Sequence, residues 1–153
     1  KLPDVIVGVA TLIGVFGALS TTKIGRIADR GYTLQLTWIG IAVLAVSWAF
    51  LYYGGQSLIS YILGYGIINF GLATVHSSNQ NIIFRLRPDA KSRINSIYMT
   101  TYFIGGACGS AVGVYAWQHG GWLMTCIAGI ILVIASAFFA LLDTLHFKRT
   151  QIA

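Results

Sequence analysis

Polar side chains interrupt the long apolar stretch at residues 57–84. Asn69 lies near its middle, and the run His76-Ser-Ser-Asn-Gln-Asn81 follows toward its end. These side chains offer hydrogen-bond donors and acceptors, and a histidine can also bind and release a proton near neutral pH. Polar groups within an apolar span are costly to bury, so they usually face a cavity or another helix. The chemistry that these residues suggest is therefore recognition or proton transfer at a buried surface.

A second polar set opens the next apolar stretch, at residues 94–117. Its members recur at three- and four-residue intervals: Asn95, Tyr98, Thr101 and Tyr102. This spacing places them on one face of a helix. That face either lines a path or packs against helices built of small residues. Gln80, near the end of the preceding stretch, is expected to tie helices together at the same end of the molecule.

Catalytic chemistry finds little support in the sequence. A serine hydrolase needs a nucleophile and a base within hydrogen-bond reach. Ser110 and His76 lie on different apolar stretches and, if both stretches cross a membrane, at different depths. The sequence has no phosphate-binding loop, and Cys108 and Cys126 fall inside apolar stretches, where small apolar residues are the simpler interpretation. We therefore expect no enzyme, no cofactor and no bound metal.

Carboxylates are scarce in this chain. There is no Glu, and the four Asp residues lie at the ends of the apolar stretches or between them: Asp4, Asp29, Asp89 and Asp143. Asp89 follows Pro88 and suits the N-cap of a helix. Coupling to protons normally needs a carboxylate or a histidine within the membrane. Such coupling would here depend on His76 or on a carboxylate upstream of this chain.

The composition indicates that lipid surrounds most of the molecule. Of 153 residues, 56% are apolar and only 9% are charged, against about a quarter charged in a soluble domain. The net charge of +6 falls in tight groups rather than on one basic face, which argues against nucleic acid. Between the groups lie five stretches of about the length that crosses a bilayer: residues 5–22, 33–53, 57–84, 94–117 and 122–142.

These five stretches should be helices, because lipid leaves every backbone amide to be satisfied within the segment. They do not alternate in polarity as barrel strands do, and five consecutive buried helices would be unusual in a soluble protein. The sequence therefore predicts an all-α, polytopic transmembrane helix bundle with five spans.

The positive charges orient the predicted spans. The segments 23–30 and 85–93 and the tail after residue 142 hold nine of the ten Lys and Arg residues, whereas 53–57 and 118–121 hold none. Cytoplasmic loops carry the Lys and Arg excess, so we expect the N-terminus outside and the C-terminus inside. The chain begins Lys-Leu-Pro-Asp without Met. With an odd span count, this start is most simply explained by further helices upstream.

Small residues predict where helices pack closely, because association in lipid depends on close backbone approach. The first span has Ala10, Gly14 and Ala18 at four-residue spacing, and the fourth has Gly105, Gly109 and Gly113. The second and fifth spans lack such stripes and are expected to be bulkier and more exposed to lipid. This order suggests a repeat of three spans, as in many transporters.

Two loops carry a resemblance to a known family. The segment Gly25-Arg-Ile-Ala-Asp-Arg30 resembles the signature cytoplasmic loop of the major facilitator superfamily of transporters. The segment Leu86-Arg-Pro-Asp-Ala-Lys-Ser-Arg-Ile-Asn-Ser-Ile-Tyr98, followed by Phe103-Ile-Gly-Gly-Ala-Cys-Gly-Ser110 and by Gly120-Gly-Trp122, looks like the entry to the eleventh helix of bacterial drug and sugar efflux members. The chain then corresponds to helices eight to twelve, part of the C-terminal six-helix bundle of a twelve-helix transporter.

The resemblance implies a function and roles for particular residues. It implies secondary active transport of a small organic solute or drug, by efflux and alternating access, in the bacterial inner membrane. Gly25, Asp29 and Arg30 would form a conformational gating loop whose partner lies in the missing N-terminal helices. Residues 57–84 would line the central cavity. The cavity candidates are Asn69, His76, Gln80 and Tyr98, with a helix–helix hydrogen bond as the alternative role for Asn69 and packing for His76. The alternative to transport is a membrane scaffold or assembly protein.

Overall fold

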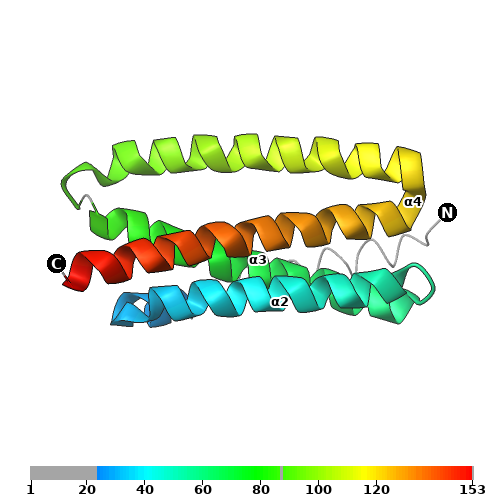
Figure 1. Cartoon of the computed structure of the whole chain (residues 1–153), viewed down its shortest axis with the longest axis horizontal. Helices are drawn as coiled ribbons and strands as arrows, with labels where there is room; N and C mark the ends of the chain where they lie inside the picture. Colours follow the sequence, from blue (N-terminus) through cyan, green and yellow to red (C-terminus); the bar gives the residue numbers. More distant parts are fainter. Residues whose placement is uncertain (1–23, 87, 153) are drawn as a thin grey trace.

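The structure is a computed structural model that describes residues 24–86 and 88–152, apart from the side chains of residues 29, 86 and 147–152. Its elements are a short π-helix η1 (Ala28–Tyr32), α2 (Thr33–Gly54), α3 (Leu58–Leu86), a 3-10 turn η2 (Pro88–Ala90) and α4 (Lys91–Ile152). The described residues contain no strand, and Figure 1 shows long helices lying side by side. The predicted all-α helix bundle is therefore confirmed.

α4 is two antiparallel helices joined at a single residue. Gly121 has φ 61° and ψ −147°, a conformation that is open essentially to glycine alone. The chain reverses there, so that residues 91–120, the first arm, and residues 122–152, the second arm, run side by side in opposite directions (Figure 1). A loop at 118–121 was expected from the sequence, whereas the structure reverses within helical residues at one glycine.

Three helical segments are long and apolar enough to cross a membrane: Arg30–Gly54, Leu58–Arg85 and Pro88–His146. The third has 59 residues, nearly three times the roughly 20 that one crossing needs, and it contains both arms of α4. The predicted spans 33–53, 57–84, 94–117 and 122–142 thus correspond to α2, α3 and the two arms. The predicted span 5–22 lies outside the described residues.

α2 and α3 form a tight antiparallel pair because glycines lie where the helices meet. A Cβ atom added at Gly40 would lie 2.6 Å from Val75 Cγ2, and one at Gly71 would lie 3.0 Å from Leu44 Cδ2. A Cβ atom at Gly64 would lie 2.8 Å from Leu51 Cγ. Gly64 and Gly71 are seven residues apart, two turns of one helix face. These contacts bring α2 and α3 so close together that a side chain at any of the three glycines would crowd the facing helix.

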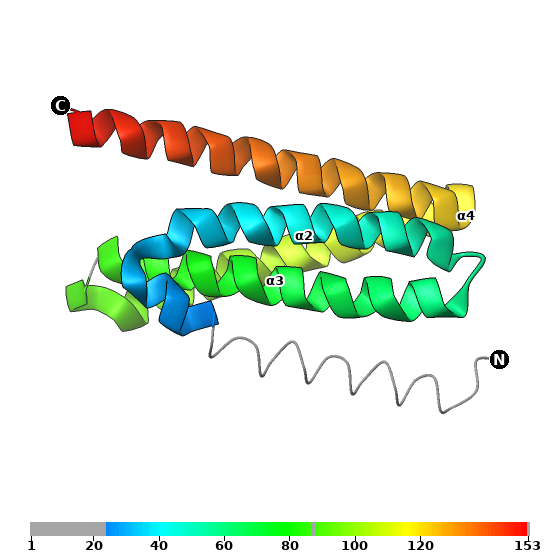
Figure 2. The same cartoon turned by 90° about the horizontal axis from the view of Figure 1, so that it is seen from below.

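The second arm packs on the opposite side of α2, so that α2 lies between α3 and this arm (Figure 2). The ring of Trp48 covers Gly129 so closely that a Cβ atom there would overlap it. At the far end, Trp122 Nε1 donates a hydrogen bond to the Leu51 carbonyl oxygen at 2.8 Å. α2 was expected to be mainly lipid-facing, but single glycines and tryptophans give it two helical neighbours.

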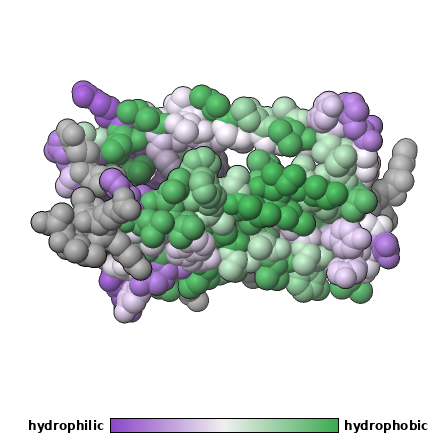
Figure 3. All heavy atoms as spheres, in the orientation of Figure 1, coloured by the Kyte–Doolittle hydropathy of each residue, from purple (hydrophilic) through white to green (hydrophobic). Residues whose placement is uncertain are grey.

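The outer surface of the described residues is strongly apolar. Figure 3 shows hydrophobic residues across the middle of the visible face and hydrophilic residues toward both ends. Large side chains stand exposed, including Ile59 at 72%, Phe103 at 67% and Phe139 at 68%. A soluble domain rarely exposes so large an apolar patch. This surface is the one that a bundle surrounded by lipid tails requires.

Candidate functional site

A cavity with a volume of about 780 Å³ lies between α3 and the two arms of α4. We refer to it as the α3–α4 cavity. Its wall is mainly apolar and glycine-rich, with a few polar groups on one side: Asn79, Thr101, Tyr102, Tyr98 and Ser136. A mostly apolar cavity with few polar groups, of roughly 300–1,000 Å³, is typical of small-molecule sites.

Helical spacing brings the polar groups of α3 and the first arm together. His76 and Asn79 are three residues apart on α3, and Tyr98 and Tyr102 are four apart on the first arm, so each pair shares a helix face. The Tyr98 hydroxyl lies 3.0 Å from His76 Nδ1. Asn79 also forms a side-chain hydrogen bond with Tyr98.

The Tyr102 ring closes this cluster against the histidine. Its centre lies 4.8 Å from that of His76 and 6.3 Å from that of Tyr98. His76 itself does not line the α3–α4 cavity, whereas both tyrosines do. Tyr98 and Tyr102 therefore stand between the histidine and the cavity, and Tyr98 is the group through which His76 can affect a bound molecule.

Gln80 and Asn95 join the same two helices nearer the basic end. Gln80 Nε2 donates to Asn95 Oδ1 at 3.5 Å, which is long for such a bond. Gln80 is not part of the cavity wall. Gln80 thus lies between α3 and the first arm, and both roles expected for it, tying helices together and contacting substrate, remain predictions.

Asn69 is separated from the polar cluster. Its Nδ2 donates to the Tyr65 carbonyl oxygen at 2.7 Å, one turn back on the same helix. It is seven residues from His76, about 10 Å along the helix axis, and it lines neither of the cavities discussed here. This hydrogen bond lies within α3, and the two roles considered from the sequence for Asn69, a substrate contact and a helix–helix hydrogen bond, remain predictions.

The predicted gating loop is a helical turn in the structure. Residues 24–27 are helical and η1 follows, with Gly31 at φ 98°. Ile24, Ala28 and Leu36 form a small buried cluster beneath it. Arg30 is exposed, no described atom lies within 4 Å of a Cβ built on Gly25, and the Asp29 side chain is outside the described part.

Arg85 forms a contact that was not predicted from the sequence. It lies at the end of α3, and its Nη2 donates to the Ala28 carbonyl oxygen at 3.0 Å. This bond connects η1 to α3 across 57 residues of sequence. The basic cluster at the end of α3 was interpreted only as a topology signal, and no spacing pattern would have identified its partner.

The glycine face of the first arm is uncovered in the described residues. A Cβ atom built on Gly105, Gly109 or Gly113 meets no described atom within 4 Å. The tight packing expected there therefore remains a prediction for segments outside the described part, as it does for Ala10, Gly14 and Ala18. Ser110 lies on this arm, twelve residues or about 18 Å from Tyr98, which separates it from His76.

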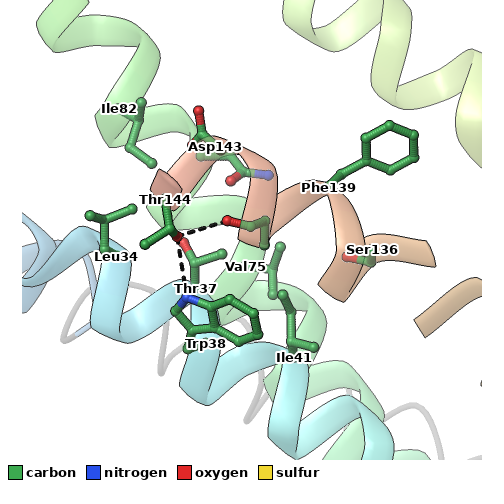
Figure 4. Close-up of a pocket in the computed structure, with 12 residues that line it drawn as sticks. Leu34, Thr37, Trp38, Ile41, Val75, Ile82, Ser136, Phe139, Asp143 and Thr144 are labelled. Carbon is green, nitrogen blue, oxygen red and sulfur yellow. Dashed lines mark hydrogen bonds between the residues drawn. The ribbon is translucent and has the colours of Figure 1, made fainter. Parts of the chain in front are cut away.

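A second cavity, of about 330 Å³, lies where α2, α3 and the second arm meet (Figure 4). We call it the basic-end cavity because it lies near the ends of the helices that carry the basic loops. Asp143 is part of its wall, and Asn79 and Ser136 line both cavities. The sequence assigned Asp143 only to the end of a span. Asp143 is spaced by three and seven residues from Ala140 and Ser136, which places all three on one helix face. This spacing is the sequence pattern that could have indicated a shared cavity.

No metal site is evident in the described ranges, where no group of three His, Cys, Asp or Glu side chains comes together. Ser77 and Ser78 on α3 are buried, at 8% and 0% exposure. Their hydroxyl oxygens have no hydrogen-bond partner among the described residues.

Comparison with known proteins gives relatives whose names include the word transporter. Over 112 residues the chain is 39% identical to the Uncharacterized transporter YgaY of Escherichia coli O157:H7, and equally to its counterpart in strain K12. Over 129 residues it is 28% identical to the Probable transporter SCO4007 of Streptomyces coelicolor. These matches cover 73% and 82% of this chain but only 28% and 30% of the relatives. The chain thus spans less than a third of the length of the curated relatives that it matches.

No family model matches the chain. No solved structure matches it either. The apolar helices and the transporter-named relatives together indicate a membrane protein.

Proposed function

We propose that this chain is part of a secondary active transporter of the major facilitator type, and that the α3–α4 cavity is part of its substrate site. The observation that carries this proposal is the cavity itself: about 780 Å³, apolar over most of its wall, with a His76–Tyr98–Asn79 hydrogen-bonded cluster at one side. Few polar groups in an apolar wall select a ligand with an apolar body and one or two hydrogen-bonding groups. The substrate class is a small organic solute or drug, moved outward.

The uncovered glycine face supports the view that the chain is part of a larger bundle. Gly105, Gly109 and Gly113 would allow another helix to approach the first arm closely, and the relatives are more than three times as long as the part matched here. In the proposal, the upstream helices of the same transporter cover this face and complete the cavity. In the proposal the protein lies in a bacterial inner membrane with its N-terminus outside and its C-terminus in the cytoplasm, and the distribution of Lys and Arg supports this orientation.

Alternating access in the proposal depends on the loop at residues 25–30. Gly25, Asp29 and Arg30 form the gating loop, and the Arg85 bond to the Ala28 carbonyl oxygen holds it against α3. A movement of this loop would thereby be transmitted to the helix that carries His76 and Asn79. His76 is the described group that could exchange protons with the site if transport is coupled to protons.

The test uses the full-length transporter in inverted membrane vesicles, with the cationic dye ethidium and the neutral dye Nile red as probes. Tyr98→Ala removes the cavity group that contacts both His76 and Asn79, and we expect transport of at least one probe to fall about tenfold. Ile97→Ala is the matched control, because its side chain is 62% exposed and is not in the cavity wall. Equal transport by the two variants, at equal protein levels, would exclude the cavity as the substrate site.

A further inference from the structure

The basic-end cavity has a composition that the proposed substrate site does not share. It contains a carboxylate, Asp143, whereas the α3–α4 cavity has no charged residue in its wall. Its volume of about 330 Å³ is at the lower limit for small-molecule sites. A site of this size suits a small headgroup or amine rather than a drug-sized molecule.

The Asp143 carboxylate is available to a ligand. It is exposed, and within the part of the chain that the structure describes no hydrogen bond or ion pair engages it. It is part of the cavity wall, and Figure 4 shows it on the second arm beside Thr144. A carboxylate at the edge of an apolar region attracts a cation more strongly than one in open water, because the surroundings screen it less.

Trp38, on α2, is another part of the cavity wall. Its Nε1 lies 3.4 Å from Thr144 Oγ1, and that hydroxyl donates in turn to the Ala140 carbonyl oxygen at 2.7 Å. Figure 4 shows both bonds as dashed lines. They fix the indole edge, so the aromatic face is what Trp38 contributes to the cavity. The face of an indole is the best cation-binding surface among aromatic side chains.

The remaining wall is suited to methyl or methylene groups. Ile41, Val75 and Ile82 provide apolar contacts, and the Thr37 hydroxyl already donates to the Thr33 carbonyl oxygen at 3.0 Å. A carboxylate, an aromatic face and an aliphatic floor together form the chemistry that recognises an organic ammonium group. A bare metal ion would find one carboxylate and no second charged ligand in this wall.

We propose that the basic-end cavity binds an organic ammonium group, with Asp143 balancing its charge and Trp38 contacting it through the ring face. The group has two sources, a free amine in the cytoplasm or the amine headgroup of a zwitterionic lipid. Because Asn79 and Ser136 line both cavities, an amine bound here lies next to the larger cavity. The proposal concerns equilibrium binding and stands whether or not the chain takes part in transport.

The experiment measures binding of radiolabelled choline to the full-length protein in detergent by equilibrium dialysis. Its neutral isostere, 3,3-dimethyl-1-butanol, tests whether the charge matters. Asp143→Asn and Trp38→Leu should each raise the Kd for choline about tenfold, while Trp38→Phe, which keeps a ring, should change it less than threefold. Asp89→Asn is the matched control, since it removes the same charge from η2 outside this cavity.

The lipid source is tested by competition in the same assay. Displacement of choline by phosphatidylethanolamine but not by phosphatidylglycerol would identify a lipid headgroup, and displacement by neither would identify a free amine; both results support the site. The proposal is overturned if the neutral isostere competes as well as unlabelled choline, if Asp143→Asn binds choline normally, or if Asp89→Asn weakens binding as much. Gel filtration of each variant confirms that the protein compared is folded.

Discussion

Gly40→Ala tests whether the α2–α3 pair is as close as the structure describes. The new methyl group would lie 2.6 Å from Val75 Cγ2, 3.2 Å from the Val75 backbone nitrogen and 3.3 Å from the Gly71 carbonyl oxygen. Ordinary contacts between carbon atoms are about 3.5–4.0 Å, so the overlap with Val75 approaches 1 Å. Val75 is β-branched and has one preferred rotamer in a helix, so its side chain cannot easily turn away. The backbone atoms of Val75 and Gly71 that also lie close to the new methyl group cannot move independently of α3. The helices must therefore separate.

The magnitude follows from two opposing effects. Overfilling a packed core costs about 1–3 kcal/mol, whereas replacing Gly by Ala within a helix stabilises it by up to about 1 kcal/mol. The expected net loss in the free energy of unfolding is about 1–2 kcal/mol. Val46→Ile is the matched control, because it also adds one carbon to α2 but at a position that is 51% exposed, and it should change stability by less than about 0.5 kcal/mol.

The assay uses the buried thiol of Cys126, which is 1% exposed. In the full-length protein with other cysteines replaced, a thiol-reactive dye becomes fluorescent only when unfolding releases Cys126. The temperature midpoint should fall for Gly40→Ala and stay unchanged for Val46→Ile. A midpoint for Gly40→Ala equal to or above that of the parent protein would refute the close α2–α3 contact.

Three further predictions test other contacts. Arg85→Leu removes the donor to the Ala28 carbonyl oxygen. A buried hydrogen bond from a charged group contributes about 1.5–3 kcal/mol to stability, and this one, from an exposed arginine, should contribute about 1 kcal/mol to holding η1 against α3. Trypsin should then cut after Arg26 faster than in the parent protein, and an unchanged rate would contradict a role for this bond. Gly121→Ala should lower the free energy of unfolding by about 1–3 kcal/mol, because φ is 61° at this residue. A temperature midpoint of unfolding equal to that of the parent protein would contradict a chain reversal at Gly121. Gly113→Leu should abolish transport in the full-length protein, since helices outside this chain are proposed to cover that face and Gly113 is not in the wall of the α3–α4 cavity; normal transport would refute such coverage.

The helices themselves were predictable because an apolar stretch in lipid must satisfy its own backbone hydrogen bonds, and a helix does this within a single segment. The predicted spans 33–53 and 57–84 differ from α2 and α3 by at most two residues at each end. The pairing of His76 with Tyr98 was not predicted from the sequence. Helical spacing placed Asn95, Tyr98, Thr101 and Tyr102 on one face, but the polar run at residues 76–81 is consecutive and goes around α3, so spacing did not single out His76.

Close packing was harder to predict because it depends on single residues rather than on stripes. A four-residue repeat was the pattern sought, but the contacts that form use Gly40 alone and a Gly64–Gly71 pair at seven-residue spacing. The sequence likewise predicts a turn near Gly121 but not that one residue makes it. The position of Asp143 in a cavity depends on how three helices meet, which no periodicity within one helix specifies.

The most direct test of the central claim uses Cys108, an exposed thiol in the wall of the α3–α4 cavity. In full-length protein with Cys126 and any other cysteines replaced, the rate of N-ethylmaleimide labelling at Cys108 is measured with and without a dye that the transporter carries. The account predicts that saturating dye slows labelling at least threefold. An unchanged rate, with dye binding verified in the same sample, would contradict the assignment of this cavity to the substrate.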